Sequence, residues 1–376
     1  MNTKPSLRLM VVMLMFPQVV ETIYSPALGS IAQSFAITDS QAAQTLSVYF
    51  LAFAFGVVVW GILADKFGRR PTMLVGLLIY AFAALVAMLT DNFAVLMLAR
   101  ALSAFGIAVG SVVTQTMLRD VFNGEELAKV FSLMGIGIAI SPVLGMLLGG
   151  QLTAIAGYHS VFLALFVMAL MLLGYNLFKL PETRQEPQPV ALVHLSFRML
   201  KDKHILYSAL LVALYNIALF AYYQLGAFAF SELGYASEQF GYSGIALGLG
   251  TLLGSYLNKS LLARKVAQDA RLLVAAILLT IGAVGVYALQ GSIWFVAPMM
   301  FVVVAFGIAI PNVLSVALVN YKQQVGSAGA LFGLLYYLMI GGGLALAGGI
   351  QQLGIVLLAC SVATLLVTVL RNKGSR

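Results

Sequence analysis

Apolar runs of helix length cover most of this 376-residue chain and restrict what it can fold into. Hydrophobic residues make up 61% of it and charged residues 9%, whereas soluble globular chains are about 45–50% apolar and 25% charged. Runs of about 20 apolar residues cross a bilayer as helices and are too long for barrel strands. The sequence therefore predicts an all-α membrane protein with twelve transmembrane helices. Their expected positions are residues 8–32, 42–64, 71–90, 93–118, 127–153, 158–179, 205–231, 239–262, 271–290, 293–320, 327–350 and 353–371.

The lysine and arginine residues mark one side of the membrane. With a cytoplasmic N-terminus, all of them except Arg100 fall in cytoplasmic segments or at the cytoplasmic ends of spans. Short cytoplasmic loops carry such an excess of positive charge, so both termini are predicted to be cytoplasmic, in a bacterial inner (plasma) membrane. These loops also account for the net charge of +8. No basic stripe with interleaved aromatic residues is present, so no nucleic-acid partner is expected.

The longest polar segment, residues 181–204, divides the predicted spans into six and six. It starts as a Pro- and charge-rich linker, PETRQEPQP, and continues as VHLSFRMLKDKH, which is expected to form an amphipathic helix on the membrane surface. The segments GILADK and GSYLNK echo each other after the second and eighth spans. Because parallel half-repeats build one class of transporter, we predict two six-helix bundles, at residues 1–180 and 205–376.

The most specific motif is GILADKFGRRPTM, residues 61–73. It resembles the loop between the second and third spans of the major facilitator superfamily, G-x-L-a-D-r-x-G-r-k-p. The resemblance implies the major facilitator fold and a cytoplasmic gate in which Asp65, Arg69 and Asp120 form a charge network. The alternatives are a generic positive loop and a set of weak solvated ion pairs. The predicted gate residues are Gly61, Asp65, Gly68, Arg69, Arg70 and Asp120.

The fourth span carries RALSAFGIAVGSVVTQTMLRD, residues 100–120. It resembles the bicyclomycin and chloramphenicol resistance (Bcr/CflA) exporters of that superfamily, although Ser103 replaces their usual Gln. At 100° per residue, its polar residues share one helix face, which is expected to line a cavity. The alternative is that Arg100 extends to the membrane interface. The residues on this face are Arg100, Ser103, Ser111 and Thr114.

The fifth span contains GIGIAISPVLGMLLGG, residues 135–150. It resembles the g-x-x-x-G-P-x-x-G-G motif of drug-exporting antiporters, with Ser141 where that motif has Gly. The resemblance favours export over uptake, whereas a Gly-rich span by itself predicts only tight helix packing. The residues assigned to this motif are Gly137, Ser141, Pro142 and Gly145.

The first span carries an acid, Glu21, in the stretch QVVETIYSPALG. Gln18, Glu21 and Ser25 lie on one helix face, and no other acid of the chain lies mid-span. A carboxylate at that depth costs roughly 2.5–3.5 kcal/mol. The resemblance implies that Glu21 exchanges protons during transport, together with Arg100. Two alternatives are open: a permanent structural pair with Arg100 or a backbone group, and a position at the membrane interface.

Aromatic and amide side chains in the spans suit an amphiphilic substrate. Tyr residues near span ends also form interfacial belts, so some of these side chains are expected to face the headgroups instead. The candidate substrate-binding residues are Gln18, Ser25, Tyr49, Ser103, Ser111, Thr114, Asn216, Tyr223, Asn312 and Tyr336.

Together these features predict a proton-coupled antiporter that exports small organic molecules, as in multidrug efflux and antibiotic resistance. It is expected to act in the lipid bilayer as a monomer, without a cofactor or metal ion. Export of an endogenous metabolite such as a siderophore is the first alternative, and an uptake symporter is the second. An intramembrane enzyme or signalling scaffold is disfavoured, because no HExxH or GxSxG motif is present and no His lies mid-span.

Overall fold

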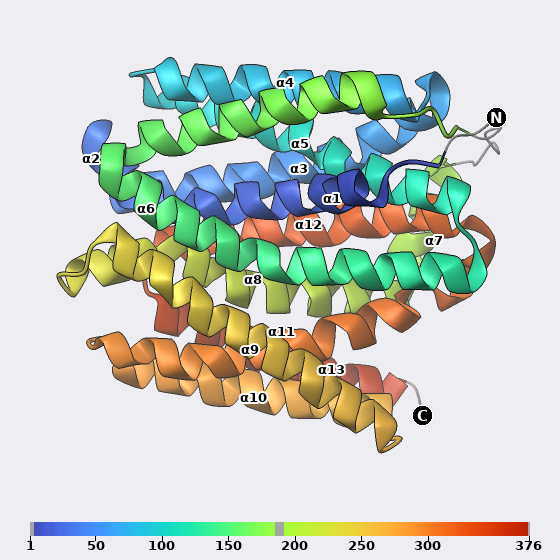
Figure 1. The fold of residues 1–376 in the computed structure, drawn as a ribbon. Coiled ribbons are helices and arrows are strands. Elements are labelled where there is room, and N and C mark those ends of the chain that lie inside the picture. The colour runs from blue at the N-terminus through green and yellow to red at the C-terminus, as the bar shows by residue number, and fades with distance from the viewer. Residues whose placement is uncertain (1–3, 185–191, 375–376) are drawn as a thin grey trace.

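The computed structural model describes residues 4–184 and 192–374, and these ranges contain helices and no strands (Figure 1). Uninterrupted apolar sequence favours helices here, since a helix pairs all its own backbone groups inside a bilayer. The first group of helices is α1 (Leu7–Ile23), η1 (Ser25–Ala27), α2 (Leu28–Ser34), α3 (Asp39–Phe67), α4 (Arg69–Leu89), α5 (Phe93–Val121) and α6 (Gly124–Lys179). The second is α7 (Leu192–Lys201), α8 (Lys203–Glu232), α9 (Ser237–Ala263), α10 (Gln268–Leu289), η2 (Ile293–Phe295), α11 (Val296–Ala317), η3 (Val319–Gln324), α12 (Val325–Ile350) and α13 (Leu353–Gly374).

Ten helical segments of the described chain are long and apolar enough to cross a membrane. One of them, α6, has 56 residues and would measure roughly 84 Å if straight, far more than an approximately 30 Å hydrocarbon core. Its backbone is non-helical at Ala156 and Gly157, where the chain turns back (Figure 1). The helix α9 has 27 residues but is not among the ten. The all-helical prediction is therefore confirmed, and the number of crossings stays a prediction.

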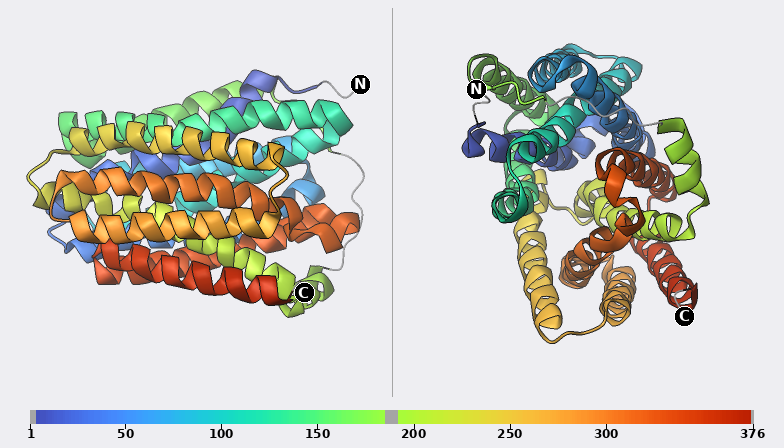
Figure 2. Two further views of the ribbon diagram at one scale, coloured as in Figure 1. Left: turned by 90° about the horizontal axis from the view of Figure 1, so that it is seen from below. Right: turned by 90° about the vertical axis from the view of Figure 1, so that its right-hand side faces the viewer.

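The helices pack as two groups that lie side by side, as the end-on view in Figure 2 shows. Helices α1 and α3–α6 contact one another, as do α8–α13. The groups meet mainly along two pairs of helices, α3 with α12 and α6 with α9. The start of α1 and the end of α13 lie at the same end of the bundle (Figures 1 and 2). The boundaries at residues 180 and 205 remain predictions.

The polar segment between the two groups is described only in part, since residues 185–191 lie outside the described ranges. The amphipathic helix expected there is present as α7, which packs against α8 and α12. Phe197 and Leu200 are exposed on it, and Arg198 and Lys201 lie in its last turn. Its location on a membrane surface remains a prediction.

Candidate functional site

The first span is broken one turn after Glu21. Helix α1 ends at Ile23, and the 3₁₀ turn Ser25–Ala27 follows, with Pro26 unable to donate a backbone hydrogen bond. The Ser25 hydroxyl donates to the backbone carbonyl of Tyr223 on α8, so the break also contacts the second group of helices. Glu21 itself is 2% exposed. This acid is therefore enclosed by protein and does not face the outer surface of the bundle.

Arg100 is enclosed by aromatic rings and not by acids. It is 1% exposed, and its guanidinium carbon lies 3.8 Å from the ring centre of Tyr24 and 4.7 Å from that of Tyr49. Such contacts stabilise a desolvated cation by about 2 kcal/mol. The ion pairs within the described chain do not include Glu21 with Arg100, although the two side chains interact electrostatically at longer range. The Arg100 side chain is thus enclosed by aromatic rings, and the described residues form no ion pair between it and Glu21.

The Arg100 guanidinium keeps unused hydrogen-bonding capacity. Its Nε and Nη2 atoms are buried and find no hydrogen-bond acceptor in the described residues, and the Tyr49 hydroxyl is equally without a partner. Buried donors left unpaired cost about 1–3 kcal/mol each, and more when charged. An acceptor brought to this place by a change of conformation or by a ligand would therefore be stabilised.

A cavity of about 720 Å³ lies between α3, α5 and α12, at the end of the bundle that carries the 61–73 loop. Phe53, Tyr336 and Tyr337 form part of its wall. The Tyr337 ring centre lies 4.9 Å from that of Phe53, and the Phe53 ring stacks on Tyr49 at 6.1 Å. Phe53 thus connects the cavity wall to Tyr49, one of the two rings around Arg100. The Glu21 carboxyl interacts electrostatically with Tyr336 and Tyr337 of this wall.

Of the ten predicted substrate-binding residues, Ser111 and Tyr336 line this cavity. Four of the other eight side chains donate hydrogen bonds within the protein: besides Ser25, Ser103 donates to the Arg100 carbonyl (2.8 Å), Asn216 to the Val212 carbonyl (2.8 Å) and Asn312 to Asn258 Oδ1 (2.7 Å). The Thr114 hydroxyl is buried without a partner in the described chain. Gln18 is half-buried, and Tyr223 is buried. The structure thus brings two of the ten to the cavity wall and leaves the others outside it.

The opposite end of the α3–α12 contact is closed by hydrogen bonds from side chains to helix carbonyls. Polar side chains of α3 and α8 donate them, and the acceptors lie mainly on α12. None of these groups is charged, so the closure rests on polar contacts worth about 0.5–1.5 kcal/mol each. The contacts are Ser40 Oγ to Gly348 O (2.7 Å), Gln44 Nε2 to Ala345 O (3.0 Å), Ser47 Oγ to Gly341 O (2.8 Å), and Gln224 Nε2 to Ala43 O and Leu344 O (both 2.9 Å).

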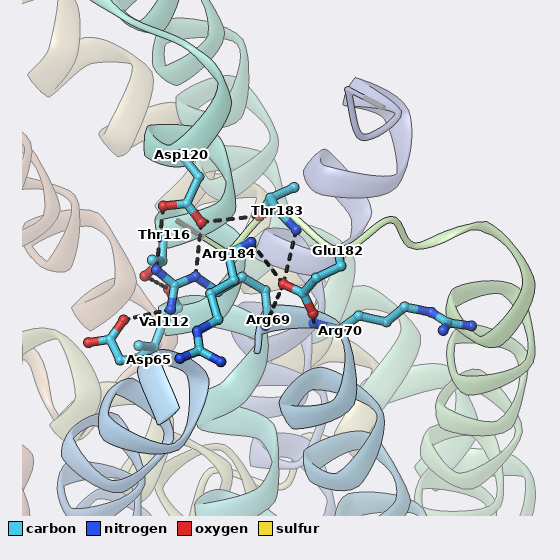
Figure 3. Close-up of polar contacts among 9 residues, drawn as sticks. All are labelled: Asp65, Arg69, Arg70, Val112, Thr116, Asp120, Glu182, Thr183 and Arg184. Atoms are coloured by element: carbon cyan, nitrogen blue, oxygen red, sulfur yellow. Dashed lines mark hydrogen bonds and ion pairs between the residues drawn. The ribbon is translucent and has the colours of Figure 1, made fainter. Parts of the chain in front are cut away.

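Of the predicted gate residues, Asp65 and Asp120 meet at the Arg69 guanidinium, whereas the Arg70 side chain points away from it and donates to the Leu177 carbonyl (2.7 Å) (Figure 3). Arg69 donates from Nε to Asp120 Oδ2 (2.9 Å) and from Nη1 to Asp65 Oδ1 (2.5 Å). Thr183 adds a hydrogen bond to the same Asp120 oxygen (3.1 Å). These hydrogen bonds join α3, α4, α5 and the segment after α6, all in the first group of helices. The structure contains both this network and the neighbouring cavity, and the gating role of the network stays a prediction.

Glu182 is a member of this cluster that the sequence analysis did not single out. Its carboxylate accepts hydrogen bonds from the backbone N–H groups of Arg69 (2.9 Å) and Arg70 (3.0 Å), which are free donors at the start of α4. Gly68, with φ of 107°, precedes that helix, and a Cβ there would lie 2.6 Å from Glu182 Oε2. The LPET sequence after the sixth span was the available signal, since an acid there can reach a helix N-terminus.

The same hydrogen bonds change the acidity of Glu182. Burial alone would raise the pKa of this carboxyl, but the backbone N–H groups of Arg69, Arg184, Arg70 and Thr183 outweigh it and hold the pKa below its usual value of 4.5. The carboxylate therefore stays charged at any physiological pH.

Acidification is expected to destabilise the protein partly through Glu182. A carboxylate with a depressed folded-state pKa stabilises the fold above its unfolded pKa, and this stabilisation is lost as pH falls through the folded pKa. The thermal unfolding midpoint, measured by scanning fluorimetry, should fall between about pH 5 and about pH 3, and less so in Glu182→Gln. Glu232→Gln, at an exposed carboxylate ending α8, serves as the control. An equal fall in wild type and Glu182→Gln would contradict this assignment.

The motif of the fifth span packs directly on the broken first span. A Cβ at Gly145 would overlap the Thr22 hydroxyl, and one at Gly149 would overlap the Ile23 carbonyl oxygen. Gly137 faces Met15, with 3.0 Å between an added Cβ and Cγ. Ser141 donates to the carbonyl of Gly137 (2.7 Å), and Pro142 lies within α6. These small residues therefore allow α6 to touch the backbone of α1 beside Glu21.

The chain matches the Major Facilitator Superfamily over residues 10–369. It belongs to this superfamily. Its relatives include an "Uncharacterized transporter" of Rickettsia felis, 29% identical over 337 residues, which are 85% of this chain and 83% of that protein. The "Multidrug resistance protein D" of Escherichia coli (strain K12) is 30% identical over 194 residues, covering 52% of this chain and 49% of that protein. The "Bicyclomycin resistance protein homolog" of Haemophilus influenzae is 27% identical over 178 residues, covering 47% of this chain and 45% of that protein.

The solved structures confirm the fold class. A D-xylose–proton symporter matches with a TM-score of 0.75 and 15% sequence identity, covering 96% of this chain and 95% of that one. At this identity the likeness concerns the fold alone. This protein is thus a multi-pass membrane transporter of the Major Facilitator Superfamily, and its relatives are consistent with a Bcr/CflA-like member.

Proposed function

We propose that this transporter is a proton-coupled antiporter that exports small organic molecules, drugs among them, from the bacterial cytoplasm. The observation that carries the proposal is the buried carboxylate of Glu21, which interacts electrostatically with Arg100 without an ion pair, while the Nε and Nη2 donors of Arg100 are unsatisfied in the described residues. A proton on Glu21 removes the charge that would attract Arg100, and its release restores that attraction. The membrane potential drives protons inward by about 2.3 kcal/mol per charge per 100 mV.

The proposed transport cycle alternates access to the cavity from the two sides. We infer twelve crossings with cytoplasmic termini, so that the cavity beside the 61–73 loop faces the cytoplasm. The bundles at residues 1–180 and 205–376 would rock about the Glu21–Arg100 region, closing the cavity and separating α3 from α12 at the other end. The side chain-to-carbonyl hydrogen bonds there are weak enough to break in each cycle.

Proteoliposomes that contain the purified full-length chain test this proposal. With an imposed pH gradient, addition of a transported drug such as chloramphenicol should release protons in exchange, which a pH-sensitive dye inside the vesicles records. Drug movement that is indifferent to the gradient would contradict proton coupling. Co-transport of drug and proton in the same direction would favour the uptake symporter instead.

A dedicated exporter of one endogenous metabolite is the second candidate. Ser103 replaces the usual Gln of the Bcr/CflA motif, and its hydroxyl is turned to its own helix carbonyl. This change removes one amide from the region next to Arg100. A response to a single metabolite, such as a siderophore, and to no drug would favour this candidate.

Removal of the Asp65 carboxylate is expected to slow transport more than it weakens substrate binding. Asp65 holds the Arg69 guanidinium from one side, and its loss leaves Asp120 as the ion-pair partner that the described residues provide for that side chain. Asp65→Ala should lower the maximal transport rate about tenfold and change the half-saturating concentration by about twofold or less. Asp91→Ala, at an exposed acid in another loop, is the control. Equal losses of rate and affinity would argue against a gating role.

A further inference from the structure

The mouth of the cavity carries an excess of positive charge. Lys66 from α3, Arg119 from α5 and Arg184 from the segment after α6 all line it. Among the described residues in its wall, Asp65 is the acid, and it is already bound to Arg69. The other polar side chains of the wall are neutral, namely Ser111, Gln115, Thr116, Ser327, Tyr336 and Tyr337.

The orientation of the chain in the membrane does not by itself require cations in the wall of the cavity. Cytoplasmic cations satisfy the positive-inside rule wherever they lie on the surface. Lys259, Arg264 and Lys265, at the end of α9, are predicted to be cytoplasmic and are exposed, yet they are outside the cavity wall. Cations that line a cleft with low-dielectric walls focus their field inside it and raise the local concentration of anions. Lys66, Arg119 and Arg184 are therefore placed to select for charge.

The inner end of the same cavity is aromatic. The ring centres of Tyr336 and Tyr337 lie 4.5 Å apart, and Tyr337 contacts Phe53. Ring faces that border a cavity accept flat apolar groups by stacking. The cavity volume of about 720 Å³ falls in the range of sites for drug-sized molecules. A cationic mouth and an aromatic end together fit a molecule that is acidic at one end and apolar at the other.

We propose that the transported substrate is an amphiphilic organic acid, which binds with its carboxylate toward Lys66, Arg119 and Arg184 and its apolar part against Phe53, Tyr336 and Tyr337. This inference rests on the proposed export function and specifies its substrate class. Outward movement of the anion and inward movement of protons then both carry positive charge inward, so the membrane potential drives both.

Equilibrium binding of three probes of one shape tests the charge preference. The probes are 2-naphthoate, the neutral 2-naphthamide and the cationic 2-naphthylmethylammonium, and the full-length chain is held in phosphatidylcholine nanodiscs without a pH gradient. We expect naphthoate to bind about tenfold more tightly than the amide, and the ammonium most weakly. Raising the salt from about 0.05 M to about 0.5 M should weaken naphthoate binding and leave the amide unchanged. Equal binding of the three probes, no saturable binding, or a preference for the cation would overturn the proposal.

Two triple variants locate the preference in the cavity. The first variant combines Lys66→Gln, Arg119→Gln and Arg184→Gln. In it, naphthoate should bind no more tightly than naphthamide, and naphthamide should bind as in the wild type. The unchanged naphthamide binding also shows that the cavity is folded. The matched control removes the same charge outside the cavity, by Lys259→Gln, Arg264→Gln and Lys265→Gln. It should still bind naphthoate more tightly than naphthamide. If both triple variants lost the preference for naphthoate equally, the preference would come from the overall charge of the protein, and the proposed site would be wrong. Loss of naphthoate binding when phosphatidylglycerol is added would assign the cations to lipid headgroups, and would equally overturn it.

The binding experiment is independent of proton coupling. If naphthoate binds as expected but drug movement ignores the pH gradient, the substrate class stands and the antiport proposal fails. If coupling is observed but the three probes bind equally, the antiport proposal stands and the substrate class fails.

Discussion

Glu21→Gln is expected to abolish proton-driven transport while the protein stays folded. The amide keeps the size and hydrogen-bonding capacity of the protonated acid, and the cost of a buried carboxylate disappears. It cannot release a proton, so the attraction to Arg100 that would accompany each cycle is lost. Uphill export in proteoliposomes should fall about 100-fold, whereas exchange of labelled for unlabelled substrate without a gradient should persist.

Glu21→Asp separates charge from size in the same assay. It retains an ionisable group on a shorter side chain and should keep part of the uphill transport. Uphill export by Glu21→Gln at the wild-type rate would show that Glu21 has no coupling role. Loss of both uphill export and exchange, with a lowered unfolding temperature, would instead favour a structural role for this acid.

Gly149→Ala is expected to disturb the contact between α6 and α1 severely. The added Cβ would overlap the carbonyl oxygen of Ile23 and lie 2.9 Å from its carbonyl carbon. Backbone atoms cannot rotate away as a side chain can, so α1 must shift next to Glu21. Overpacking of this kind costs about 1–3 kcal/mol. A displacement of about 1 Å at a functional group can cost about 100-fold in rate. Transport and the thermal unfolding midpoint should both fall.

Gly135→Ala provides the matched control on the same helix. An added Cβ at Gly135 meets no atom within 4 Å, so the substitution introduces the same atom without the overlap. Alanine also favours a helix over glycine by about 0.8–1.0 kcal/mol. Stability should therefore be unchanged or slightly higher. Equal effects of the two substitutions would indicate that helix propensity, and not the α1–α6 contact, determines the outcome.

The spacing of the motifs predicted contacts between residues that are close in the sequence. Asp65 and Arg69 are four residues apart across the break between α3 and α4, and the structure brings both together with Asp120. The gating and coupling roles of these residues remain to be measured. Glu182 was missed because the acid of the LPET sequence did not show which helix N-terminus it reaches, and its partners are the backbone N–H groups of Arg69 and Arg70. Its position more than 100 residues later is brought there by the return of α6.

Side-chain direction was the least predictable feature. Helix-face placement and residue type together predicted ten substrate-binding residues, of which Ser111 and Tyr336 line the cavity. Ser103 and Asn216 instead donate to carbonyls of their own helices, an option open to any short polar side chain in a helix. Periodicity specifies a face, and it does not say whether that face meets a neighbour or a cavity.

The sequence by itself determined that this chain is helical and embedded in a membrane, since uninterrupted apolar runs leave the helix as the means of pairing the backbone. Its motifs also determined the superfamily. The tertiary structure decided which side chains share an environment: the rings around Arg100, the absence of a Glu21–Arg100 ion pair among the described residues, and the cations at the cavity mouth. These features depend on how two groups of helices are placed against each other, and contacts between residues hundreds of positions apart cannot be derived from local spacing.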